Sequence, residues 1–167
     1  MQCPEEAFLP LVGQLVRSVR RGYGTFLTLE FGSPHLVVRE PIVASPEAPP
    51  RVRKRLARRR VTVAGDWHLW VQYAQWKIQT ENYSTASEDA DAALIEGALE
   101  ELDGQRLTSS SEGPEPHSCI LRFDLNASLH IRPSSETDDD QWSIYEANGR
   151  IASCSNRGEI TWEDRQA

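Results

Sequence analysis

The chain has 167 residues, of which 39% are hydrophobic, and its five tryptophans favour a folded globular protein over a disordered one. No segment approaches the ~20 apolar residues of a membrane span, and the acidic N-terminus does not resemble a secretory signal. The net charge of −7 is divided unevenly, because residues 1–84 carry 12 Lys and Arg against 7 Asp and Glu, whereas residues 85–167 carry 6 against 18.

The first half of the chain opens with the pattern of an antiparallel β-meander. Residues 15–20 and 25–31 alternate loosely in polarity around a Gly-rich turn at 21–24, which predicts a hairpin. A Gly-Ser-Pro turn follows, and residues 36–39 form an apolar run bounded by prolines. We therefore expect three strands that pair in chain order.

A basic segment then interrupts the first half. Residues 46–50 are rich in proline, and the apolar residues within and just after 51–60 recur at roughly helical spacing. This pattern predicts a short basic helix with Pro50 near its first turn. Its cations can neutralise the phosphates of a nucleic acid or contact an acidic protein. They are Arg51, Arg53, Lys54, Arg55, Arg58, Arg59 and Arg60.

A tryptophan heads the next predicted strand, at 67–73, and another heads the predicted strand at 142–146. Side chains three residues apart on a strand point to opposite faces, so one aromatic residue of each strand is expected in the core and the other at the surface. For Trp142 both core packing and a role as a binding anchor are open interpretations. Trp70 and Tyr73 are candidates for an exposed aromatic contact.

The clearest helix is predicted between the halves, at about 87–102. Thr85 or Ser87 can cap it, acidic residues follow at its N-terminus, and Gly104 ends it. Its apolar residues share one face, which predicts packing against the core.

The second half repeats the meander at 106–110, 118–125 and 127–132, and continues with an acidic segment at 134–140. The acidic segment lacks the alternating spacing of a calcium loop, so we expect a solvated loop without a metal. Asn-Gly at 148–149 predicts a hairpin turn.

Four motifs of the first half return in the second half, and such self-similarity indicates a duplicated architecture. They are 11–14 with 102–105, 27–31 with 119–123, 36–39 with 129–132, and 67–70 with 142–145. We predict an α+β fold with two similar antiparallel β-meander units, 1–84 and 85–167, in a pseudo-two-fold arrangement joined by the helix at 87–102. The two units are expected to form one fused globular body.

The second half resembles a family of small uncharacterised bacterial β-rich domains. The resemblance is carried by Leu-Asp-Gly-Gln at 102–105, the strand pattern at 121–133, Asp-Asp-Asp-Gln-Trp-Ser-Ile-Tyr at 138–145 and Asn-Gly-Arg at 148–150. It implies a bacterial protein of unassigned function, in a class of small acidic proteins that includes immunity proteins. It implies no functional residue.

No catalytic signature is present. The four histidines are scattered outside any metal-ligand spacing, and the three cysteines form no CxxC pair, which favours a reduced, cytoplasmic protein. His117 and Cys119 would share a face of one strand, which is a weak indication of a nucleophile pair. The sequence therefore favours a protein that is not an enzyme and needs no cofactor.

We expect a bacterial protein-binding protein, immunity-like, whose acidic surface engages a basic partner such as a nuclease toxin. The alternative is a nucleic-acid-associated protein that uses 51–60. A homodimer through the two loops of opposite charge is also open, whereas a membrane partner is not expected. The predicted partner-binding residues are Asp138, Asp139, Asp140, Trp142, Trp70 and Tyr73.

Overall fold

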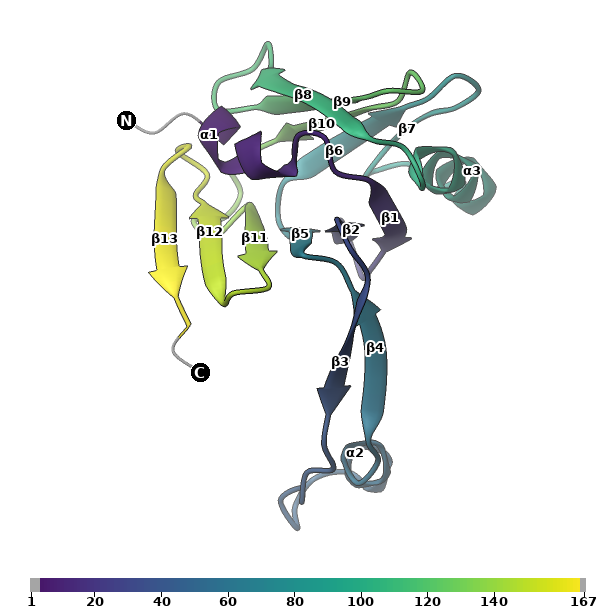
Figure 1. The fold of residues 1–167 in the computed structure, drawn as a ribbon, viewed down its shortest axis with the longest axis vertical. Coiled ribbons are helices and arrows are strands. Elements are labelled where there is room, and N and C mark those ends of the chain that lie inside the picture. Colours follow the sequence, from purple (N-terminus) through teal and green to yellow (C-terminus); the bar gives the residue numbers. More distant parts are fainter. Residues whose placement is uncertain (1–3, 166–167) are drawn as a thin grey trace.

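The computed structural model describes residues 4–165 and shows a β-rich protein built from antiparallel sheets (Figure 1). The helical elements in this range are α1 (Pro4–Phe8), the short 3-10 turn η1 (Leu9–Leu11), α2 (Pro50–Leu56) and α3 (Ala92–Leu102). The strands of the first half are β1 (Val16–Arg21), β2 (Leu27–Phe31), β3 (His35–Arg39), β4 (Arg60–Ala64), β5 (Trp67–Val71), β6 (Gln75–Gln79) and β7 (Ser84–Ala86). Those of the second half are β8 (Leu107–Glu112), β9 (Cys119–Phe123), β10 (Ser128–Arg132), β11 (Trp142–Glu146), β12 (Arg150–Cys154) and β13 (Ile160–Asp164).

Two of the sheets mix strands from both halves of the chain. The six-stranded sheet has the order β1-β2-β5-β11-β12-β13, and the five-stranded sheet has the order β7-β6-β10-β9-β8. The centre of each sheet is therefore a pairing between the halves, β5 with β11 and β6 with β10. Neither half builds either of these two sheets from its own strands alone.

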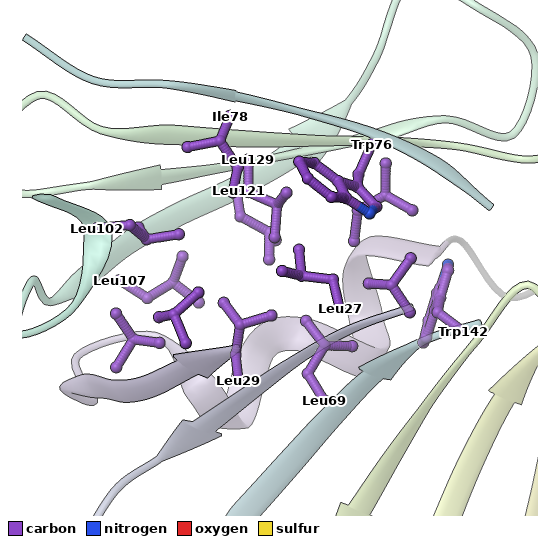
Figure 2. Packing of buried hydrophobic residues seen from close by; sticks show 14 of the residues in the cluster. Leu27, Leu29, Leu69, Trp76, Ile78, Leu102, Leu107, Leu121, Leu129 and Trp142 are labelled. Carbon is purple, nitrogen blue, oxygen red and sulfur yellow. The ribbon is translucent and has the colours of Figure 1, made fainter. Parts of the chain in front are cut away.

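The core lies between the inner faces of these two sheets (Figure 2). In β2 the residues alternate, so that Leu27, Leu29 and Phe31 are fully buried while the side chains between them point outward. Trp76 and Ile78 of β6 meet them from the opposite sheet. Each such side chain contributes roughly 1.5–3 kcal/mol by leaving water.

Helix α3 begins later than the sequence predicts. Asp91 caps it by accepting hydrogen bonds from the backbone N–H of Ala93 and Leu94 at 3.0 and 3.2 Å. Asp89 instead accepts from the N–H of Ala86, so the preceding residues form a turn and not a first helical turn. The predicted apolar face is confirmed, since Ile95, Ala98, Leu99 and Leu102 are buried.

The three-stranded meander predicted for the first half is wrong. β2 is flanked by β1 and β5, whereas β3 pairs only with β4 in a separate two-stranded ribbon. The ribbon carries α2 at its far end and projects from the two-sheet body (Figure 1). We call residues 35–64 the arm and the remaining described residues the body. The meander predicted for the second half, β8-β9-β10, is confirmed.

Candidate binding surfaces

One face of the arm consists of aliphatic side chains. The ribbon register places Leu36 opposite Val63 and Val38 opposite Val61, and directly paired residues of adjacent strands share a face. These four side chains are 65%, 51%, 49% and 52% exposed, respectively, because no second layer covers the ribbon. We call them the aliphatic face.

The opposite face of the arm has a mixed character. It presents Val37 beside Thr62, and Arg39 beside Arg60. Val37 is 46% exposed, close to the value of its neighbour Val38 on the aliphatic face. The two valines therefore differ mainly in the face that they occupy.

The arm ends in a basic tip. The predicted basic helix is present, but α2 covers only Pro50–Leu56, and Arg60 already belongs to β4. An open hollow of about 730 Å³ lies at this end. Its lining residues are Arg39, Arg51, Lys54, Arg55, Arg58, Arg59, Arg60 and Val61. Arg53 is exposed and lies outside this lining.

Most of the tip's positive charge has no acidic neighbour. Among the described residues, the ion pair at the tip joins Arg59 Nη2 to Glu40 Oε2 at 2.9 Å. Arg39 has a structural role, since its guanidinium donates to the carbonyl oxygen of Leu56 at the end of α2 at 3.4 Å and to that of Arg58 just beyond the helix at 2.9 Å. The remaining cations face solvent around the hollow.

Side chains of the body hold the base of the arm. Arg17 Nη2 donates to the carbonyl oxygen of Ala64 at 2.7 Å, and the N–H of Gly65 donates to Glu30 Oε2 at 2.8 Å. The N–H of Ser33 donates to the Asp66 carboxylate at 2.9 Å. These contacts fix the two chain segments where the ribbon leaves the body.

Glu30 links the arm base to His68. Its Oε1 shares a hydrogen bond with His68 Nδ1, and both residues border a pocket of about 490 Å³ beside β4. Burial raises the pKa of Glu30, but the hydrogen bonds from His68 and Gly65 and the charges of His68 and Arg17 outweigh this and lower it below its ordinary value. The sequence places both residues on strands, but only the β2–β5 pairing, which it does not reveal, brings them together.

The predicted acidic loop is exposed and ordered by its neighbours. Asp138, Asp139 and Asp140 face solvent. The buried side chain of Gln141 accepts from the N–H of Ser134 at 2.7 Å and donates to the carbonyl of Asp139 at 2.9 Å. The loop is thus presented in one conformation with its charges outward.

Trp142 directly follows this loop but lies in the core, whereas Trp70 and Tyr73 lie outside the core. Trp70 and Tyr73 both make edge-to-face contacts with Phe26, and Tyr73 is 43% exposed. The loop reaches them through the carbonyl of Gln141, which accepts from the N–H of Gln72. Trp142 is fully buried against Phe8, so its proposed role as a partner contact is corrected to core packing.

The two residues considered as a nucleophile pair lie in different surroundings. Cys119 is buried in the core at the start of β9, whereas His117 lies in the preceding turn with φ +62°. Burial, followed by the charge of Asp140, raises the pKa of the Cys154 thiol to about 12, which suppresses its nucleophilic thiolate. Within residues 4–165, no cluster of three or more His, Cys, Asp or Glu side chains is placed to hold a metal.

No helix among the described residues has the length and apolar character needed to cross a bilayer. Comparison with protein-family models, with curated proteins and with solved structures gives no match for this chain.

Proposed function

We propose that this chain is a non-catalytic protein-binding protein and that the arm is its docking element. The observation that carries the proposal is the aliphatic face of the arm, whose four side chains are each about half exposed or more. An isolated two-stranded ribbon is marginally stable in water, and exposed apolar side chains gathered on one face mark an interaction site. A partner that covers this face would stabilise the ribbon and remove its apolar side chains from water.

Charge defines what the partner must offer. The arm contains eight Lys and Arg against Glu40 and Glu47, a net charge of +6, so the rest of the chain carries −13. A partner that fits the arm has an apolar patch for the ribbon and acidic groups beside it for the basic tip.

A protein fits this description better than a nucleic acid does. The arm has no Phe, Trp or Tyr, the side chains on which unpaired bases stack. Phosphates could occupy the basic tip, but they would leave the aliphatic face uncovered. Nucleic-acid binding through 51–60 is therefore the second candidate, favoured only by the hollow of the tip.

We also propose that the two halves are copies of one β unit, in a register different from the one predicted. In this register β10 matches β5 and β11 matches β6, so Trp142 matches Trp76. It is supported by reciprocal hydrogen bonds of 2.8 Å, from Gly13 N–H to the Leu107 carbonyl and from Gly104 N–H to the Val16 carbonyl. On this proposal the arm is an insertion between the second and third strands, with no counterpart in the other copy.

The expectation of a basic partner, such as a nuclease toxin, stays a proposal for a second surface of the body. It is supported by the exposed Asp138, Asp139 and Asp140 and by Trp70 and Tyr73, which flank the Gln72 N–H that donates to Gln141 just after these aspartates. Carboxylates and aromatic faces both attract cationic side chains. The immunity-like assignment rests on this surface.

Val38→Asp tests the docking role of the arm. We immobilise the wild-type chain and the variant, pass host lysate over both with and without nuclease treatment, and compare the material retained. Val38→Asp places a charge on the aliphatic face, so the specific partner should be lost. Val37→Asp makes the same change on the opposite face at similar exposure, and Leu125→Asp makes it on the body, where Leu125 is 63% exposed. Both controls should retain the partner.

Equal retention by Val38→Asp and Val37→Asp would overturn the docking role of the aliphatic face. Retained material that disappears on nuclease treatment, and that Arg55→Glu with Arg58→Glu abolishes, would support nucleic-acid binding in its place.

A further inference from the structure

We propose that the arm docks on a second copy of this chain, in a two-fold dimer in which two arms pack antiparallel and each basic tip lies against the body of the other copy. This inference rests on the proposed function of the arm and names its partner.

The aliphatic face is self-complementary. In a two-fold dimer the same surface patch meets itself, so a patch must be able to contact its own copy favourably. The aliphatic face contains no charged or hydrogen-bonding side chain, since its members are Leu36, Val38, Val61 and Val63. Two such faces can pack together without leaving a buried polar side chain unpaired.

The aliphatic faces alone are too small for a stable dimer. A standard protein interface buries about 800 Å² on each partner, which takes roughly 20–30 residues a side. The aliphatic face supplies four side chains, so a stable dimer must bury a further part of the arm. The tip is the remaining part of the arm that projects away from its own body (Figure 1).

Charge selects the antiparallel arrangement. If two arms packed in parallel, their tips would lie together and their acidic bodies would also lie together, and both contacts would be repulsive. If the arms pack antiparallel, each +6 arm ends beside a body of charge −13. Opposite charges then meet at both ends of the interface, which favours this orientation and speeds association.

The contact of each basic tip with the body of the other copy also places the cations of the tip near acidic groups. Within the described chain, Arg59 pairs with Glu40, while Arg51, Lys54, Arg55 and Arg58 line the open hollow without an ion pair. The net negative charge of a second body would attract the cations that have no ion pair among the described residues of their own copy.

Sedimentation of the purified full-length chain tests the dimer, at protein concentrations up to roughly 100 µM, where even a weak dimer is populated. The wild type should dimerise at low salt. Val38→Asp should raise the dimer dissociation constant by at least about tenfold, because it buries a carboxylate against aliphatic groups. Val37→Asp, on the opposite face of the same strand, should dimerise like the wild type.

Salt and charge reversal test the orientation. The Debye length shrinks from about 10 Å at 0.1 M salt to about 3 Å at 1 M, so added salt should weaken the wild-type dimer. Arg55→Glu with Arg58→Glu should weaken the dimer and flatten this salt dependence. Arg157→Glu with Arg165→Glu makes the same charge change on exposed residues of the body and should not weaken the dimer.

Three results would overturn the inference: a wild-type chain that stays monomeric throughout, a dimer that Val38→Asp leaves intact, or a dimer that salt and the tip variant do not affect. A monomeric chain whose capture of another protein still requires Val38 would leave the proposed function standing. Loss of both dimer formation and Val38-dependent capture would remove the two together.

Discussion

The residues at the base of the arm show how single side chains position a surface element. A Cβ built on Gly65 would lie 2.3 Å from the backbone carbonyl oxygen of Phe31, so only glycine lets the ribbon leave the body so closely. The same close approach brings the Gly65 N–H to the Glu30 carboxylate. The direction of the arm is thus set by backbone contact and by the partly buried carboxylate of Glu30.

Glu30→Gln should lower the free energy of unfolding at neutral pH by about 1–3 kcal/mol, because a neutral amide replaces a carboxylate in partly buried hydrogen bonds. Gln can still accept from the Gly65 N–H, so the arm base should keep its conformation. Urea unfolding at pH 7 measures the effect.

The difference in the free energy of unfolding between the wild type and Glu30→Gln should depend on pH. The pKa of Glu30 is lowered by folding, so its contribution is complete above the ordinary Glu pKa of about 4.3 and is lost as the pH falls through the lower folded value. The wild type should therefore approach the stability of Glu30→Gln below pH of about 4. Glu81→Gln, at an exposed position, should show no such convergence. A difference in the free energy of unfolding that stays constant down to acid pH would mean that the charge of the Glu30 carboxylate does not contribute to stability.

At the scale of elements, alternation predicts strands well and their partners poorly. The polarity pattern places β2, β9 and β11 within a residue or two of their observed positions. It predicts helix α3 from about residue 87 with Thr85 or Ser87 as its cap, whereas the helix begins at Ala92 with Asp91 as its cap. The pattern could not show that residues 35–39 pair with 60–64. Strands that follow each other in the chain usually pair, so residues 35–39 are expected to pair with the strand just before them. Only the aliphatic residues on one face of 35–39 and 60–64 indicate that these two segments form an exposed ribbon.

Removal of the arm tests whether it is independent of the core. No residue of the buried cluster lies between Phe31 and Leu69, and His35 is paired with Ala64, so a short Gly-Ser linker can replace residues 35–64. The body should remain folded, with a thermal midpoint close to that of the wild type, because it loses no core side chain. The linker variant should be monomeric and should capture no arm-dependent partner. A collapse of cooperative unfolding, measured by circular dichroism, would show that the arm stabilises the body.

At the scale of the whole molecule, the sequence motifs predict two similar halves but do not show how the two halves combine. The repeated motifs predict two β-meander units fused into one pseudo-two-fold body, without showing which strands pair between them. In the structure the pairs β5–β11 and β6–β10 cross between halves, and Trp76 and Trp142 fill the core from opposite sheets. Such pairings are long-range, so no local pattern records them.

The exposed acidic loop could be predicted because burying its charges in a core would be unfavourable, whereas the burial of Trp142 follows from tertiary packing alone.

The crossed pairing makes a prediction about the two halves as separate chains. Residues 1–84 contain β5 and β6 without their partners from the other half, and residues 85–167 contain β10 and β11 without theirs. Each half is also of a size at which a buried core is marginal. Neither fragment should unfold cooperatively alone, whereas the two refolded together should recover the near-ultraviolet circular dichroism of the intact chain, since the core needs side chains from both. Two fragments that are instead divided at residue 95, within α3, should recover less of this circular dichroism signal when refolded together. Ile95, Ala98 and Leu99 must pack as one helix, which this division breaks. A fragment 1–84 or 85–167 that melts cooperatively at the temperature of the intact protein would mean that the halves do not share their core.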